Sequence, residues 1–131
     1  MKMLNYELSW STEDGYSGND LSTNTASVPI RVDNVTICAI SLKWDGALEG
    51  TFRIQACNGD YARGKNLTPA QLTAEIDDDD WFNVPDAVLN ITGDSGIYIF
   101  NLSDLGYTYL RVIWEAGNGA ATVVSRVTIK S

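Results

Sequence analysis

The residues with the clearest potential for chemistry form one run of consecutive carboxylates. They are Asp77, Asp78, Asp79 and Asp80. With Asp60, Glu75 and Asp86 nearby in sequence, the run could supply oxygen ligands to Ca²⁺, but it lacks the spacing and turn glycine of an EF-hand loop. Charge runs are usually solvated, so we expect an acidic loop without a metal and keep a Ca²⁺ site as the alternative.

Paired carboxylates could also serve a glycosidase, but nothing in the sequence holds two acids at a defined separation. The chain contains no histidine, which removes the usual general base and the commonest transition-metal ligand. Two cysteines are too few for a zinc site. We therefore expect a protein that is not an enzyme and that has no cofactor.

The two cysteines lie in segments with strand-like alternation. Cys38 shares the apolar face with Ile40 and Leu42, while Cys57 shares the other face with Gln55. Side chains on opposite faces of a strand pair cannot approach each other, so we expect two free thiols.

Four tryptophans could form a platform for stacking on sugars. Trp44 and Trp114 fall on apolar faces and are predicted to lie in the core. Trp10 and Trp81 adjoin polar loops, and we expect these two to be exposed. An exposed Trp81 is the basis of one alternative function, a carbohydrate-binding module.

The formal net charge is −8, from nine basic and seventeen acidic residues. This balance disfavours nucleic acid and anionic membranes as partners, because both bind clustered Lys and Arg. The sequence has no apolar run of membrane-spanning length, and its first residues lack the apolar stretch of a signal peptide. We expect a protein made in the cytoplasm.

Residues 37–57 provide the strongest secondary-structure signal, because apolar and polar residues alternate on both sides of the segment 45–50, which contains two glycines. We expect a hairpin that places its apolar residues on one wall of a half-buried sheet. The predicted pairs are Trp44 with Phe52, Leu42 with Ile54, and Ile40 with Ala56. The predicted core residues are Ile40, Leu42, Trp44, Phe52, Ile54, Leu110, Val112 and Trp114.

Further strands are predicted along the chain, separated by turn residues. They cover residues 6–11, 28–32, 81–84, 88–92, 97–102, 107–115 and 122–130. The first is expected at a sheet edge, and 97–102, apolar on both faces, at a sheet centre. Residues 116–119 are expected to close a hairpin.

The segment 61–80 interrupts the strand rhythm and contains the signals of a short helix. Thr68 suits an N-cap, Pro69 the first helical position, and Gln71 the third position of a capping box. Leu67 and Leu72 have the spacing of a hydrophobic staple. The whole pattern predicts one all-β domain over residues 1–131, an antiparallel β-sandwich of jelly-roll type. It would have about eight or nine short strands and this single helix in an inserted loop.

Several stretches resemble a group of small phage- and prophage-encoded β-sandwich proteins that belong to the virion. The matching segments are V-P-I-R-V-D-N-V-T from Val28, S-L-K-W-D-G-A-L-E-G-T-F-R-I-Q-A-C-N-G-D, D-W-F-N-V, S-G-I-Y-I-F-N-L-S-D-L-G-Y-T-Y-L-R-V-I-W-E, and G-N-G-A-A-T with the last strand. The chain departs from this group where residues 61–79 separate the turn from the tryptophan strand. It also has a more distant similarity to discoidin-like domains.

The resemblance implies a structural protein of the virion, most simply a capsid decoration protein, with a tail or fibre component as the alternative. Phage capsid or tail proteins would be its partners, and a homo-oligomer, such as a trimer, is expected. Contacts are expected in two long connections, 16–25 and 61–81. The predicted contact residues are Tyr16, Asp20, Tyr61, Arg63, Lys65, Asp79 and Trp81.

Overall fold

The computed structural model describes residues 3–13, 15–59, 67–103 and 105–131. Nine strands and two short helical segments lie within these described ranges. The strands are β1 (Met3–Leu8), β2 (Thr25–Ala26), β3 (Ile30–Arg31), β4 (Ile37–Asp45), β5 (Leu48–Cys57), β6 (Phe82–Gly93), β7 (Gly96–Ser103), β8 (Tyr109–Gly119) and β9 (Thr122–Lys130). The helical segments are α1 (Pro69–Glu75) and the 3-10 turn η1 (Asp78–Asp80).

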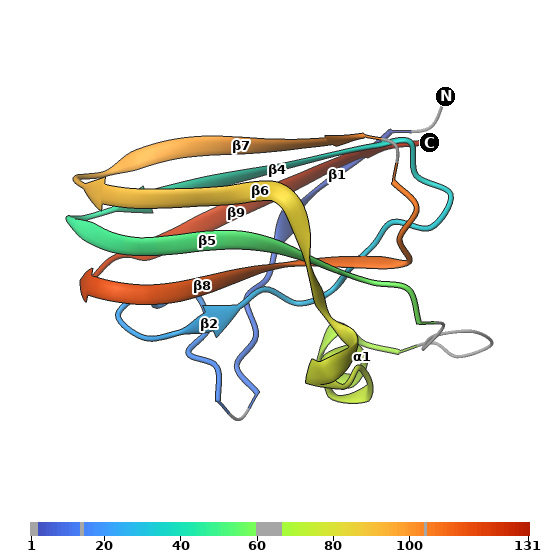
Figure 1. Ribbon diagram of the computed structural model, residues 1–131, viewed down its shortest axis with the longest axis horizontal. Helices are drawn as coiled ribbons and strands as arrows, with labels where there is room; N and C mark the ends of the chain where they lie inside the picture. The colour runs from blue at the N-terminus through green and yellow to red at the C-terminus, as the bar shows by residue number, and fades with distance from the viewer. Residues whose placement is uncertain (1–2, 14, 60–66, 104) are drawn as a thin grey trace.

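The strands form two antiparallel sheets that lie one above the other (Figure 1). Sheet 1 has the order β1-β9-β4-β7, and sheet 2 has the order β2-β8-β5-β6, with β3 also paired to β8. The predicted all-β sandwich with one short α-helix is therefore confirmed. Neither described helix is long and apolar enough to cross a membrane.

The predicted hairpin of residues 37–57 is wrong, because β4 and β5 belong to different sheets. β4 pairs with β7 and β9, and β5 pairs with β6 and β8. Trp44 and Phe52 do meet, with ring centroids 6.1 Å apart, but they meet across the interior of the sandwich. Alternation identifies which side of a strand is buried, and both arrangements bury the same side.

The connection from β8 to β9 also joins two different sheets. β8 lies in sheet 2 and β9 in sheet 1, so residues 116–119 do not close a hairpin. β6 and β7 also lie in different sheets. Each of these three short connections carries the chain from one sheet to the other, and the sandwich is held together by strands distant in sequence.

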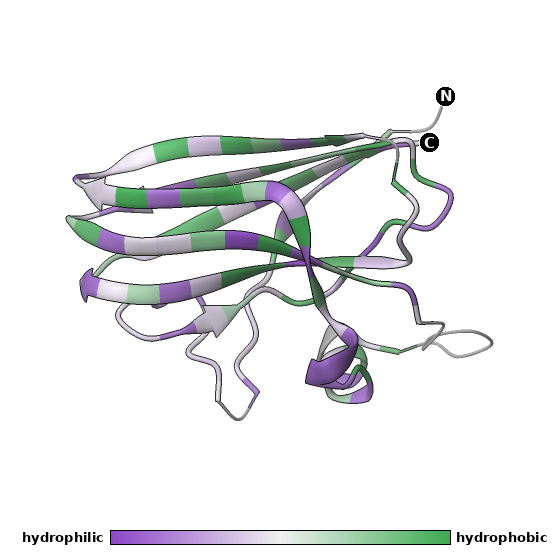
Figure 2. Ribbon diagram, in the orientation of Figure 1, coloured by the Kyte–Doolittle hydropathy of each residue, from purple (hydrophilic) through white to green (hydrophobic). Residues whose placement is uncertain are grey.

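The core lies between the sheets and contains all eight predicted core residues, each buried. Phe52 is at its centre, with ring centroids 4.5 Å from Trp114 and 6.2 Å from Trp10. Hydropathy alternates along the strands as this packing requires (Figure 2). Burying such aromatic rings supplies a large share of the hydrophobic stabilisation.

Two strand predictions need correction. The two strands predicted at 81–84 and 88–92 are one strand, β6, which begins at Phe82 and in which Pro85 and the left-handed Asp86 (φ 64°) make a bulge instead of an end. Residues 97–102 belong to β7, which pairs only with β4 and forms an edge of sheet 1. Its Ile97 and Ile99 are 66% and 50% exposed, so this apolar strand is not covered on both sides.

The N-terminal region of the sandwich is more ordered than its polar composition indicates. The first strand lies at a sheet edge, as predicted, but β1 covers Met3–Leu8 and not residues 6–11. Residues 15–25 form mostly turns and loop until Thr25 begins β2, and Leu21 among them is fully buried. The Trp114 indole N–H donates to the Leu21 carbonyl oxygen over 2.8 Å, which ties this arm to the core.

The short helix forms where the capping signals place it. The Thr68 side chain accepts from the Gln71 N–H, and the Gln71 side chain accepts from the Thr68 N–H. Leu67 and Leu72 pack in the same apolar cluster, on the outer side of sheet 2. That cluster contains Cys57, Leu72, Ile76, Trp81 and Tyr109, with Leu67 beside it. The helix thus covers one end of sheet 2 (Figure 1).

Both cysteines are free, as predicted, and both are buried. The two thiols are apart because Cys38 lies in the main core and Cys57 lies beneath α1, and not because they lie on opposite faces of one hairpin. Burial raises the pKa of the Cys38 thiol to about 12. Burial, together with the nearby Cys38, also raises the pKa of Tyr6 to about 12.

Candidate functional site

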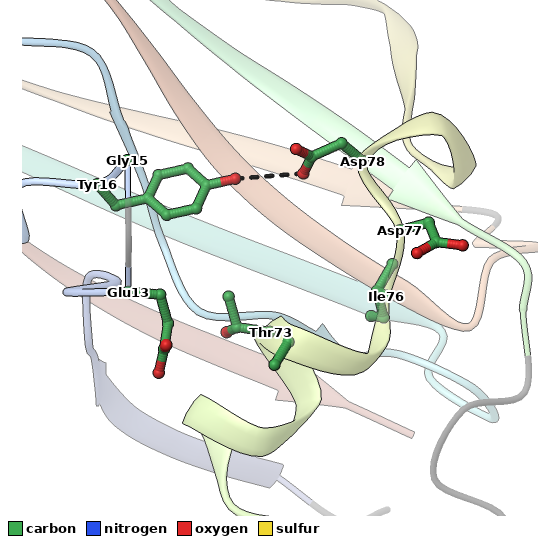
Figure 3. Close-up of a pocket in the computed structure, with 8 residues that line it drawn as sticks. Glu13, Gly15, Tyr16, Thr73, Ile76, Asp77 and Asp78 are labelled. Carbon is green, nitrogen blue, oxygen red and sulfur yellow. Dashed lines mark hydrogen bonds between the residues drawn. The ribbon is translucent and has the colours of Figure 1, made fainter.

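An open groove of about 470 Å³ lies between the N-terminal arm and the helical segment. The arm contributes Glu13, Gly15 and Tyr16, and the facing side is formed by residues 73–78 (Figure 3). The Tyr16 hydroxyl donates to Asp78 Oδ1 over 3.3 Å and so joins the two sides. The acids Glu13, Asp77 and Asp78 give the groove a negative character.

Arg111 lies below this contact, with a side chain only 11% exposed. Its Nε donates to the Gln55 side-chain oxygen over 2.9 Å, and its Nη1 donates to the Tyr16 hydroxyl over 3.4 Å. The same nitrogen is 3.8 Å from Asp78 Oδ1. Its guanidinium carbon lies 4.5 Å from the centroid of the Trp81 ring. Arg111 thus holds the arm and η1 onto the outer side of sheet 2.

The expectation that Trp81 and Trp10 are exposed is wrong, because each is only 8% exposed. Trp81 packs with Leu72 and Ile76 of the helical segment and below Arg111. Trp10 packs on Phe52, and its indole N–H donates to the Ser125 hydroxyl over 3.1 Å. Both rings are covered by the chain itself, and neither is available for stacking on a sugar.

The predicted contact residues are only partly brought together. Tyr16 lines the groove, Asp79 is exposed in η1, and the buried Trp81 lies behind them. Asp20 is exposed and pairs with Thr122, where the Ser22 backbone N–H holds the pKa of its carboxyl below the usual value. Tyr61, Arg63 and Lys65 lie outside the described residues.

Three residues of the acidic run, Asp78, Asp79 and Asp80, form the 3-10 turn η1, and Asp77 directly precedes this turn. Within the described ranges, no three His, Cys, Asp or Glu side chains are grouped so that they could hold a metal ion. Asp60, one of the acids proposed to assist a Ca²⁺ site, lies outside those ranges.

The outer face of sheet 2 is occupied by polar side chains that bond to one another. Arg53 Nε contacts Glu115 Oε1 at 2.8 Å, and the Thr51 hydroxyl donates to Asn90 over 2.8 Å. The Gln55 amide nitrogen donates to Asn83 over 3.1 Å. A polar face whose donors and acceptors are already paired offers few groups for a ligand to use.

The outer face of sheet 1 differs, and sequence reasoning did not single it out. The structure describes nine exposed large hydrophobic side chains, and seven of them lie on strands of sheet 1. Five have the register of the outer face: Met3, Ile37, Ile97, Ile99 and Val124. Ile97 and Val124 flank Lys43 in one row across β7, β4 and β9. The signal was present in the apolar run of β7, which was assigned to the interior.

No known protein-family description and no curated protein sequence matches the chain. Among solved structures, the SPBc2 prophage-derived protein YomS is similar over 98% of this chain and 96% of its own, at 9% identity and a TM-score of 0.49. A CBM4 structure is similar over 96% of this chain and 78% of its own, at 17% identity and a TM-score of 0.45. The low-affinity xylan-binding module CBM86 from Roseburia intestinalis is similar over 99% of this chain and 96% of its own, at 13% identity and a TM-score of 0.45. These similarities are between folds, and they do not identify what this chain binds.

Proposed function

We propose that this protein is a non-enzymatic structural component of a bacteriophage particle, a capsid decoration protein that adds contacts to the shell. The bacteriophage setting comes from the sequence resemblance over most of the chain from Val28. The observation that supports an assembly role is the aliphatic outer face of sheet 1, with Ile97, Ile99 and Val124 each at least half exposed. Several exposed aliphatic side chains on one face are more typical of a protein–protein contact surface than of a solvated surface.

The carbohydrate-binding alternative receives less support from the same surface. All four tryptophans are at most 8% exposed, so the planar indole rings that could stack on sugars are inside the molecule. Phe82 is 42% exposed, but its ring meets Tyr107 at 66°, which does not make a flat platform. Exposed isoleucine and valine side chains also lack the flat face on which a sugar ring stacks.

Two measurements on purified material test the proposal. Quantitative mass spectrometry of particles, from a phage or induced prophage that encodes this chain, should find the protein in stoichiometric amounts. Cryo-electron microscopy of the same particles should place it on the shell; density in the tail would favour the tail or fibre alternative. Absence from particles, together with saturable glycan binding by the isolated protein, would contradict the proposed function.

A further inference from the structure

Among the residues that the structure describes, the cations are paired with carboxylates except on one face. The structure describes six lysines and arginines. Arg31, Arg53 and Arg111 have the carboxylates of Asp33, Glu115 and Asp78 within 4.0 Å. The other three cations form no ion pair within the described chain and share the outer face of sheet 1: Lys43, Arg126 and Lys130.

The carboxylates on this face are fewer than its three cations, and none forms an ion pair with them among the described residues. Arg126 donates from Nε to the amide oxygen of Asn5 over 3.1 Å, which is a neutral partner. Glu7 and Asp45 also belong to this face by register; Glu7 lies directly opposite Arg126, and the Asp45 carboxylate accepts from the Ser95 hydroxyl. The outer face of sheet 1 therefore has one more positive than negative charge, in a chain whose net charge is −8.

Apolar side chains flank two of the three cations, Lys43 and Lys130. Lys43 lies in register between Ile97 and Val124, and Lys130 lies in register between Ile37 and Met3. All four aliphatic neighbours are exposed. A face of this composition is suited to a partner that is acidic and also has apolar surface, which describes a protein better than a polyanion.

The chain presents negative surface on its opposite side. Glu13, Asp77, Asp78 and Asp79 are exposed around the groove beside α1, and we call this surface the acidic end. Among described cations, only Arg111 contacts it, and that side chain is mostly buried. The helix lies on the outer side of sheet 2, away from sheet 1 (Figure 1).

We propose that the outer face of sheet 1 docks a second copy of this chain, which presents its acidic end. Charge complementarity identifies the occupant, because the unpaired cations on one side of the molecule match the surplus acids on the other. The contact is heterologous, so it closes into a ring or continues as a chain according to the rotation between copies. The inference rests on the proposed function for its setting and names the partner of that same face.

Nucleic acid and anionic membranes fit this face less well than a second copy. Three cations among exposed aliphatic side chains do not form the dense basic stripe that phosphate binding requires. The net charge of −8 would repel both polyanions. Binding of the isolated protein to a duplex DNA oligonucleotide or to phosphatidylserine vesicles, without self-association, would overturn the proposal.

Sedimentation velocity of the purified protein over a concentration series tests the contact. The wild type should show a sedimentation coefficient that rises with concentration. The variant K43E/K130E should lose this rise because its sheet 1 face becomes acidic. The variant D77K/D79K should lose it too, because its acidic end becomes basic. An equimolar mixture of the two variants should regain the rise of the sedimentation coefficient with concentration. The acidic end of K43E/K130E fits the intact sheet 1 face of D77K/D79K. The basic end of D77K/D79K likewise fits the acidic sheet 1 face of K43E/K130E.

The control variant R31E/R53E changes the net charge as much as K43E/K130E but lies off the sheet 1 face. It should associate like the wild type, and circular dichroism of every variant establishes that each is folded. A wild type that stays monomeric at all concentrations would overturn the inference, as would a variant mixture that stays monomeric. A monomeric protein found in stoichiometric amounts on particles would overturn this inference alone. An oligomer absent from particles would overturn only the proposed function.

Discussion

At the scale of single residues, the burial of the four tryptophans bears most directly on the choice between an assembly role and carbohydrate binding. The sequence placed Trp44 and Trp114 in the core because they sit at alternating apolar positions, and both are buried. Trp10 and Trp81 follow polar loops, which made them candidates for exposure. Both are buried because the arm and the helical segment fold over the sandwich, and the sequence neighbours of a residue cannot show such covering.

The two thiols should be unreactive in the folded protein. Cys38 and Cys57 are each 0% exposed, and burial raises the pKa of Cys38 to about 12. With a thiol-specific chromogenic disulfide at pH 8, we expect no labelling of the native protein and two labelled thiols per chain in denaturant. Rapid labelling of the native protein at either position would contradict the observed burial.

Gly50 should be hard to replace because Trp114 packs directly on its backbone. A Cβ at position 50 would lie 2.4 Å from Trp114 Cη2 and 2.5 Å from the Glu115 carbonyl oxygen. We expect Gly50→Ala to lower the free energy of unfolding by about 1–3 kcal/mol, measured by urea denaturation. Gly106→Ala is the matched control, since a Cβ there meets nothing within 4 Å and should change stability by less than about 0.5 kcal/mol.

Asp33 should stabilise the fold except in acid. Hydrogen bonds from Arg31, at 2.7 and 3.1 Å, hold the pKa of the Asp33 carboxyl below its usual value. The stabilisation is therefore complete above the unfolded-state pKa, near 4, and is lost as the pH falls through the lower folded-state pKa. Urea midpoints of the wild type and Asp33→Asn should differ at pH 7 and converge below about pH 4. A difference that stays constant to pH 2 would exclude this ion pair as its cause.

At the scale of elements, strands and the helix were predictable from local pattern, while strand pairing was not. Alternation in residues 37–57 correctly identified two strands and their buried sides. It could not show that Trp44 and Phe52 face each other across two sheets, since a hairpin would bury the same residues. The apolar strand β7 was placed at a sheet centre for a related reason, because composition does not reveal how many neighbours a strand has.

The helix α1 was predictable because its signals are local. Thr68→Ala removes the acceptor for the Gln71 N–H, 3.2 Å away, and should lower the free energy of unfolding by about 0.5–2 kcal/mol. Thr68→Ser keeps a hydroxyl acceptor at the N-cap and should retain most of the stability. Equal losses from the two substitutions, measured by urea denaturation, would show that the cap does not stabilise the helix.

At the scale of the whole molecule, the two outer faces differ in a way that the sequence did not reveal. Sheet 2 presents polar side chains bonded to one another, and sheet 1 presents exposed aliphatic side chains around unpaired cations. Which face a residue occupies depends on register between strands far apart in the chain, such as β4 with β9. The candidate site based on residues 16–25 and 61–81 came from connection length, and only Tyr16 and part of residues 73–78 from these ranges line the acidic groove.

The central claim is that the outer face of sheet 1 is covered in the assembled state. Carbene footprinting with mass spectrometry, on purified particles and on the dilute isolated protein, tests this claim most directly. Ile97, Ile99 and Val124 should be labelled several-fold less on the particle, while Val88 on sheet 2, 38% exposed, should be labelled equally in both. Unchanged labelling of the three sheet 1 residues on the particle, or protection of Val88 instead, would contradict the claim.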